Sequence, residues 1–287
     1  MTPEQFIEEV HQSSIMPSDF DKVYEDFCKY QQMVIATLNE FHRVCEKNNI
    51  PYQLAFGSLL GAIRDNGQIP WDYDVDVYVP HSERTRLIEV LAKDLQDDFY
   101  VYCPEVNPKC RHMILRIAPK GYRSEVLHVD VFFITGAPQD QKEFKKYAKK
   151  IRTLFDARFY KLVDIAVEAK GHPKHAIKLW LYRMKHIFIP VKKGFRQYMK
   201  LCDQYPIEES ERFINANQYA ETYKLPADSV LTTMIYETAI GTFRISTKYD
   251  VLLTEWYSDY HRIPSLESRL KELYSSYKRI KKFENLH

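Results

Sequence analysis

The chain has 287 residues, of which 45% are hydrophobic and 28% are charged, so it is long enough for one large domain or two modest ones with a real core. No apolar run approaches the ~20 residues of a membrane-spanning helix, and the acidic N-terminal sequence MTPEQFIEEV is unlike a secretory signal. The net charge of +2 conceals an asymmetry. Nine Lys or Arg and no Asp or Glu fall between Ala169 and Cys202, which leaves −7 on the rest of the chain.

The first half of the chain alternates helical and extended patterns. Apolar residues three or four apart predict a long helix from about Val23 to Cys45, ended by Asn48, Asn49 and Pro51. A second helix carrying Leu87, Leu91 and Leu95 is expected after Ser82, which would cap it. Extended segments are predicted at YQLAFGS (52–58), DVDVYVP (74–80), FYVYCP (99–104), HMILRIAP (112–119) and LHVDVFFIT (127–135), with a short helix SLLGAIRD (58–65) and a loop DNGQIPW (65–71) between the first two.

The second half is expected to be mostly helical. After Pro138 the pattern is helical to about Tyr223, with interruptions at 171–173 and at Pro190. ETAIGTFRIS (237–246) predicts a β element and YDVLLTEWYSDY (249–260) a helix. This order indicates an α+β fold in four segments: a helical segment 1–50, an α+β core 51–138, a helical basic region 139–240, and a β element with a helix at 241–287 that completes the core.

The five cysteines are scattered and show no CxxC spacing. Reduced thiols are therefore expected rather than disulfides or a zinc site, which favours a cytoplasmic protein. The cysteines are Cys28, Cys45, Cys103, Cys110 and Cys202.

Acidic residues occupy every second position in WDYDVDVYVP, beside an apolar run. Side chains at i and i+2 of a strand share a face, so Asp74 and Asp76 project together while the valines pack on the other side. Two ionised carboxylates this close repel each other unless a cation lies between them, and Mg²⁺ or Mn²⁺ suits such hard oxygen ligands. Asp130, the one acid in the apolar strand 127–134, would supply a third ligand from a neighbouring strand.

Two structural explanations for these acids remain open at this point. Asp74 and Asp76 could be solvated carboxylates on an edge strand. Asp130 could pair with Arg116 or Arg123 instead of a metal ion.

The residues before the acids strengthen the metal hypothesis. Gly57 and Ser58 lie between a predicted strand and a short helix, where backbone N–H groups and the helix N-terminus can approach a phosphate. The order strand, Gly-Ser, short helix, DxD strand and distant strand Asp resembles the nucleotidyltransferase fold of polymerase-β-like enzymes. That resemblance implies a mixed sheet with flanking helices.

The local sequence resembles one family within that fold. FGSLLGAIRDNGQIPWDYDVDV (56–77) is similar to the LicD signature GTLLGAhRHxGhIPWDDDhDh, in which h is apolar. HVDVF (128–132) resembles the family's second acidic strand, and GTFRISTKYDVLLTEWYSDYHRIP (241–264) its C-terminal element. The resemblance spans most of residues 30–265. Two departures are Tyr73, where the family often has an acid, and the missing proline after the second acidic strand; alternation predicts that Tyr73 faces away from the acids.

The resemblance implies an activity. LicD-like proteins, including the fukutin group, are phosphotransferases that move a phosphoalcohol from a CDP-activated alcohol such as CDP-choline to a hydroxyl of teichoic acid, lipopolysaccharide or another glycan, and CMP leaves. By this likeness Asp74, Asp76 and Asp130 would bind Mg²⁺ or Mn²⁺, and Gly57 and Ser58 would line the phosphates.

Neighbouring residues have more than one possible role. Asp76 is the first choice for a ligand that bridges two ions. Asp72 would orient the acceptor hydroxyl, act as the base or pair with Arg64, and Arg64 could instead contact phosphate. Trp71 could stack on a sugar or base, although a core position is favoured.

The basic segment at 170–200 has two interpretations. Ile177, Trp180, Met184 and Phe188 fall at helical spacing among lysines, as in helices that lie on an anionic membrane surface. A peripheral contact with the inner face of the membrane would suit a lipid-linked glycan acceptor. Packing of this stripe on the catalytic domain, with solvated lysines, is favoured, and nucleic acid is disfavoured because the rest of the chain is acidic. Three histidines, His172, His175 and His186, are expected at the surface.

Three other functions are weighed. A nucleotidyltransferase adding NMP to a small molecule would release pyrophosphate instead of CMP. An inactive glycan-binding scaffold would not need the three acids. A metal-dependent glycosyltransferase, which also uses a DxD motif, usually begins with a nucleotide-binding α/β sheet, and that order is not seen here.

Overall fold

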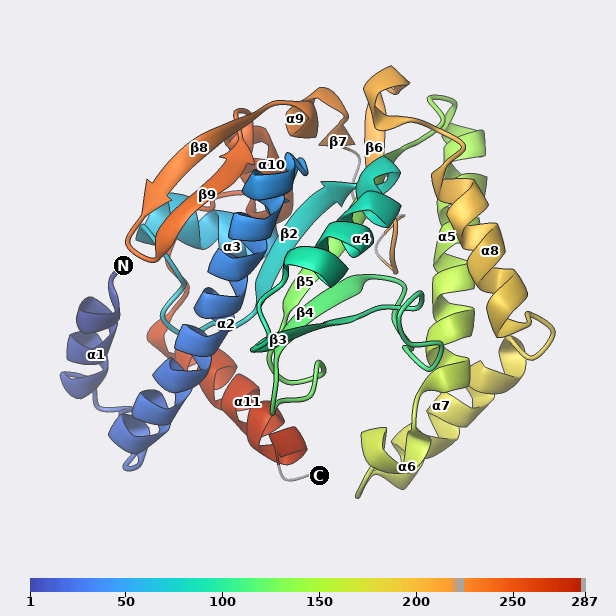
Figure 1. Cartoon of the computed structure of the whole chain (residues 1–287). Coiled ribbons are helices and arrows are strands. Elements are labelled where there is room, and N and C mark those ends of the chain that lie inside the picture. The colour runs from blue at the N-terminus through green and yellow to red at the C-terminus, as the bar shows by residue number, and fades with distance from the viewer. Residues whose placement is uncertain (219, 221–224, 285–287) are drawn as a thin grey trace.

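The computed structural model describes residues 1–218, 220 and 225–284, and strand β5 lies at the centre of its main sheet (Figure 1). β5 pairs in parallel with β2 on one side and in antiparallel fashion with β4 and β6 on the other. The sheet is therefore mixed, with strand order β1-β2-β5-β4-β3, and β6 continues it to β7. The strands are β1 Gln53–Leu54, β2 Val75–Pro80, β3 Phe99–Tyr102, β4 Leu115–Pro119, β5 Val129–Gly136, β6 Arg212–Asn215 and β7 Leu225–Pro226.

Helices cover this sheet, so the expected α+β class is confirmed (Figure 1). The long helix α2 packs on β4 and β2, and α5 and α8 lie side by side as a separate layer. A two-stranded hairpin, β8 Thr233–Thr238 and β9 Gly241–Ser246, packs against β1. The helices are α1 Pro3–His11, α2 Phe20–Asn48, α3 Phe56–Leu60, α4 Arg84–Asp94, α5 Gln141–Leu162, α6 Ile165–Glu168, α7 Pro173–Lys185, α8 Val191–Cys202, α9 Asp228–Leu231, α10 Tyr249–Tyr257 and α11 Leu266–Glu284.

The apolar stripe predicted for the long helix is confirmed in α2. All seven of its residues are buried, and the helix ends where Asn49 adopts a left-handed conformation with φ of 51°. The interruptions predicted at 171–173 and at Pro190 separate α6 from α7 and α7 from α8. None of the helices in the described part of the chain combines the length and the apolar character needed to cross a bilayer. The buried stripe consists of Val23, Phe27, Tyr30, Val34, Leu38, Phe41 and Cys45.

Two predicted features are wrong. Ser82 does not cap α4, because a 3-10 turn, His81–Glu83, precedes the helix and no side-chain cap is formed at Glu83. The chain is not helical up to Tyr223, because Arg212–Asn215 forms strand β6 on the outer end of β5. Such a short strand carries no periodicity of its own, and its pairing with β5 determines its conformation. Residues 219 and 221–223 of this predicted helical stretch lie outside the described residues.

The loop between α3 and β2 is closed by two glycines. A π-helical turn, Gly61–Asp65, continues α3, and the Gly67 N–H donates a hydrogen bond to the Gly61 carbonyl oxygen at 3.0 Å. A Cβ on Gly61 would lie 2.4 Å from the Gly67 carbonyl oxygen, whereas a Cβ on Gly67 would meet Ile240 at an ordinary 3.4 Å. Only Gly61 is therefore required for the close approach of the two backbone segments.

We expect Gly61→Ala to lower the free energy of unfolding by about 1–3 kcal/mol, because the backbone must shift to admit the new methyl group. Gly67→Ala is the matched control and should change it by well under that amount. Thermal denaturation of the three proteins measures both effects. If both variants lost the same free energy of unfolding, the close approach of the two backbone segments would not explain the glycine at position 61.

Candidate functional site

Two acids of the site are neighbours across the parallel pair β2–β5. The strand register places Asp76 directly opposite Asp130, and residues opposite each other in register project to the same face of the sheet. On the other side of β5 the antiparallel register places Arg116 of β4 opposite Asp130. Three adjacent strands therefore present the row Asp76, Asp130 and Arg116.

Asp130 is an ion-pair partner of Arg116 in this row. The guanidinium Nε lies 2.7 Å from Asp130 Oδ1, and His128 Nε2 lies 3.3 Å from the same oxygen. Burial raises the pKa of Asp130, but the nearby Arg116 and His128 outweigh burial and hold this pKa below its usual value. Of the sequence alternatives for Asp130, pairing with Arg116 is thus realised, and the carboxylate stays ionised.

The other three acids lack such a cation. Asp74 is exposed and immediately precedes β2, whereas Asp72 and Asp76 are half-buried. Burial, followed by repulsion from Asp130 and Asp74, raises the pKa of Asp76 well above its usual value. Burial and the Asp74 charge raise the pKa of Asp72 to about 8. None of these three carboxylates has an ion-pair partner among the described residues, so the site holds excess negative charge.

Gly57 and Ser58 contact two acids of this site. The Ser58 hydroxyl accepts a hydrogen bond from the Asp76 N–H at 2.8 Å, so Ser58 holds β2 against α3. Gly57 lies beside Asp72, whose Oδ2 would be 3.1 Å from a Cβ at that position. The preceding residue, Phe56, has a φ of 45°, which is strained for an aromatic residue. Its ring packs 4.5 Å from that of Trp256 on α10, which helps to hold this strained turn in place.

The acids fit a divalent cation in charge and donor type. Asp72, Asp74 and Asp76 offer hard oxygen donors whose mutual repulsion a cation would relieve. No three His, Cys, Asp or Glu side chains of the described residues already converge as a metal site. Binding through Asp74, Asp76 and Asp130 would therefore require side-chain rotation, including partial release of Asp130 from Arg116.

Three predicted site neighbours have structural partners. Arg64 pairs with Asp65 at 2.7 Å and not with Asp72. Trp71 is 3% exposed and packs on the Phe6 ring, so the favoured core position is confirmed. Tyr73 is buried against Phe27 of α2, facing away from the acids as predicted.

A cavity of about 540 Å³ adjoins Asp72 and Gly57. Its far wall comes from the segment after α10 and from α11, including Asp259, Arg262 and Glu272. The Glu272 carboxyl is close enough to Asp74 that burial together with this charge raises its pKa. Sequence reasoning assigned no role to these residues, although the C-terminal motif that holds Asp259 and Arg262 was part of the resemblance. The remaining lining residues are Leu60, Arg64, Ile69, Trp71, Tyr257, Tyr260, Pro264, Ser265 and Ser268.

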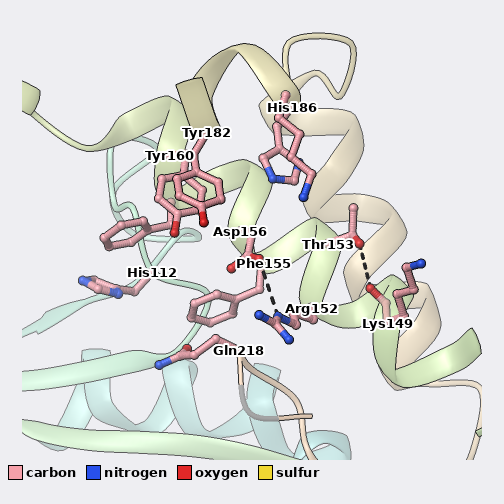
Figure 2. Close-up of a pocket in the computed structure, with 12 residues that line it drawn as sticks. His112, Lys149, Arg152, Thr153, Phe155, Asp156, Tyr160, Tyr182, His186 and Gln218 are labelled. Atoms are coloured by element: carbon pink, nitrogen blue, oxygen red, sulfur yellow. Dashed lines mark hydrogen bonds and ion pairs between the residues drawn. The ribbon is translucent and has the colours of Figure 1, made fainter. Parts of the chain in front are cut away.

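A larger cavity, of about 950 Å³, lies between α5, α7 and the segment before β4 (Figure 2). Tyr160 and Tyr182 form a stacked wall with centroids 4.7 Å apart, and Phe155 and His112 lie across from them. His112 is close to Arg116, and burial, Arg116 and Arg111 hold its pKa well below the usual value. The cavity therefore ends at His112, a residue near Arg116. The other lining residues are Lys149, Arg152, Thr153, Asp156, Phe159, Lys185, His186 and Gln218.

Two expectations for the basic segment are wrong. The apolar stripe does not pack on the rest of the protein, because Ile177, Trp180, Met184 and Phe188 are all exposed. His186 is buried, since its ring stacks parallel to that of Tyr160. His172 and His175 are exposed as expected, and the five cysteines are free thiols.

The chain is similar to known proteins. Residues 49–161, which contain all four acids, match the family described as LicD/FKTN/FKRP, nucleotidyltransferase domain. The lipopolysaccharide cholinephosphotransferase LicD of Haemophilus influenzae is 28% identical over 256 residues, which cover 83% of this chain and 93% of that protein. An uncharacterized protein of Rickettsia prowazekii is 32% identical over 80 residues, 28% of this chain and 30% of its own. One of Rickettsia typhi is 33% identical over 75 residues, 24% of each chain.

The different surroundings of Asp76 and Asp130 predict opposite effects of two matched substitutions on thermal stability. Asp76→Asn should raise the melting temperature in EDTA by about 2–4 °C, the shift that ~1 kcal/mol of relieved repulsion produces. Asp130→Asn should destabilise the protein by about 3–5 kcal/mol, because it leaves the buried Arg116 without its counter-ion.

Asp97→Asn, which changes an exposed acid, is the control and should leave the melting temperature unchanged. Thermal denaturation in EDTA checks all three variants. A lower melting temperature for Asp76→Asn would contradict the interpretation that repulsion dominates at this position.

Proposed function

The chain belongs to the LicD family and is an enzyme of the LicD type, and from this we propose that it transfers a phosphoalcohol such as phosphocholine from a CDP-activated donor to a glycan hydroxyl. The cluster of acids at β2 and β5 is the observation that carries the proposal: Asp76 lies opposite Asp130, and Asp72 and Asp74 lie just before β2. The similarity to a lipopolysaccharide cholinephosphotransferase supports the phosphoalcohol and the glycan. We further propose a nucleotidyltransferase-type core, from the description of the matching family.

In the proposed reaction the acceptor hydroxyl oxygen attacks the phosphorus that bears the alcohol. A new O–P bond forms in line with the bond that breaks to the bridging oxygen, CMP takes the electron pair, and the hydroxyl proton passes to a base. Asp72 is the candidate to orient the hydroxyl or take its proton, since it lies at the boundary between the acid row and the smaller cavity. Positioning and charge stabilisation supply most of the catalysis in such transfers.

We propose Mg²⁺ or Mn²⁺ as the cofactor, held by Asp74, Asp76 and Asp130. A divalent ion supplies charge neutralisation for the diphosphate and Lewis-acid activation of the hydroxyl. Ser58 keeps Asp76 in position through its backbone hydrogen bond. Arg116 holds the pKa of Asp130 below its usual value and so favours the ionised carboxylate that a metal ligand requires.

The two cavities suggest where the substrates bind. The smaller cavity offers close backbone approach at Gly57 and the cations Arg64 and Arg262, which suits the donor diphosphate. The larger cavity offers the Tyr160–Tyr182 wall and a cationic rim that includes Lys185, which suits a sugar carrying negative charge. Asp76 and Asp130 would then lie between donor and acceptor.

The free thiols support a cytoplasmic reaction.

The donor is tested by incubating the protein with Mg²⁺ and, in turn, CDP-choline, CDP-ribitol, CDP-glycerol, ATP and UDP-glucose. We expect a CDP-alcohol to raise native stability by ~2.7 kcal/mol at about 100 times its Kd. With a glycan acceptor, CMP should be released, and Asp76→Asn should reduce its rate at least about a hundredfold. Asp97→Asn is the control and should retain full activity.

Pyrophosphate release from a nucleoside triphosphate would favour nucleotidyl transfer instead. A response to UDP-glucose alone would favour a glycosyltransferase. Ligand binding without any turnover by the wild type, persisting in Asp76→Asn, would favour an inactive scaffold.

Arg262→Gln tests the donor cavity. Because Arg262 is exposed on the cavity wall, we expect the substitution to raise the KM for the donor about tenfold, the loss of one charge-assisted contact, with an unchanged melting temperature. Steady-state kinetics with varied donor and fixed acceptor measure the change. Arg86→Gln, an exposed arginine on α4, is the control, and a rise in the acceptor KM alone would contradict the assignment.

A further inference from the structure

Helix α7 and the turn that follows it expose a continuous apolar face. Phe188 is 93% exposed, and Trp180 is 52% exposed. Elsewhere on the described surface, exposed large apolar residues such as Val106 and Ile235 occur singly along the chain. We call this surface the α7 face, and it consists of Ile177, Trp180, Leu181, Met184, Ile187 and Phe188.

The opposite side of α7 fixes the orientation of this face. Leu179 is 5% exposed, and Arg183 Nε donates a hydrogen bond to the Tyr160 carbonyl oxygen of α5 at 2.9 Å. In the turn, Lys161 Nζ donates to the Ile187 carbonyl oxygen at 2.8 Å, and the buried His186 stacks on Tyr160. The apolar side chains are therefore exposed by a helix that is anchored, not by a loose segment.

The charge along the segment that contains the α7 face has one sign. Between Ala169 and Cys202 there are nine basic residues and no acid, and Arg183 is the one of them that is half-buried. The eight exposed ones form no ion pair with an acid of the described chain. They are Lys170, Lys174, Lys178, Lys185, Lys192, Lys193, Arg196 and Lys200.

We propose that the α7 face docks on the surface of an anionic lipid bilayer. A helix with Trp, Phe, Leu and Ile on one side and lysines around them matches the chemistry of a bilayer interface, where apolar side chains enter the acyl boundary and cations meet the lipid phosphates. A second copy of the chain is a poor occupant, because two such faces would bring the exposed, unpaired lysines of α7 against those of the other copy.

Docking would bring one proposed substrate to the protein. The inner side of α7 contributes Tyr182, Lys185 and His186 to the larger cavity, so this cavity lies behind the α7 face. A glycan acceptor carried by a lipid would therefore meet the protein where its anchor is embedded. The delivery of a lipid-linked acceptor rests on the proposed function. Docking of the α7 face does not, and docking can be measured without substrates.

The test is sedimentation of the full chain with vesicles made of equal parts phosphatidylcholine and phosphatidylglycerol, compared with vesicles of phosphatidylcholine alone. We expect binding to the anionic vesicles that falls with added salt. We also expect a blue shift of Trp180 emission, because Trp71 is buried and Trp256 is half-buried. Phe188→Glu and the double variant Lys192→Glu/Lys193→Glu should each weaken binding roughly tenfold or more.

Matched controls are Val106→Glu and Lys145→Glu/Lys146→Glu, which alter exposed residues elsewhere and should bind like the wild type. Failure to bind anionic vesicles, or equal losses in the controls, would overturn the proposal. Concentration-dependent dimerisation without lipid that Phe188→Glu abolishes would overturn it too, since a second copy would then cover the face. If Phe188→Glu loses vesicle binding but still releases CMP with a soluble acceptor, the α7 face serves membrane docking and not the reaction itself.

Discussion

The candidate site depends on how like charges are accommodated where β2 and β5 run side by side. The parallel register brings Asp76 opposite Asp130, which would be costly for two bare carboxylates. The antiparallel register of β4 supplies Arg116 on the other side of Asp130, so one of the two charges is balanced by the sheet itself. The order of three strands thereby determines which acid has a counter-ion and which has none among the described residues.

Contacts outside the sheet fix the positions of the acids on and before β2. Gln31 of α2 donates a hydrogen bond to the Asp72 carbonyl oxygen at 2.6 Å, and Gln68 donates to the same atom at 3.0 Å. The apolar side of β2, with Val75 and Val77, is buried in the core, so a slip of one residue would bury the acids and expose the valines. The position of the acids is thus set by burial on one side and by backbone hydrogen bonds at the loop.

Much of the site could be predicted from sequence because its acids lie in strongly patterned strands. The alternation in 74–80 and the lone acid of 127–134 were enough to predict the two strands and their charged face. Their parallel pairing and the wall formed by Arg262 and Glu272 were not predictable, since they depend on contacts between distant segments. Arg116 was one of two partners that the sequence offered for Asp130, and only the structure decides between them. His128 could have been found, because it lies two residues before Asp130, and residues two apart in an extended segment project to the same side.

The topology of the sheet also suggests an order in which its charges meet during folding. Arg116 and Asp130 are close in the chain and lie on adjacent antiparallel strands, whereas Asp76 reaches Asp130 only after the long connection through α4, β3 and β4 is closed. Contacts between nearby segments generally form before those that close long loops. Asp76 would then approach a carboxylate that already has its counter-ion, and the chain would avoid forming its central strand pair against the full repulsion of two unpaired acids.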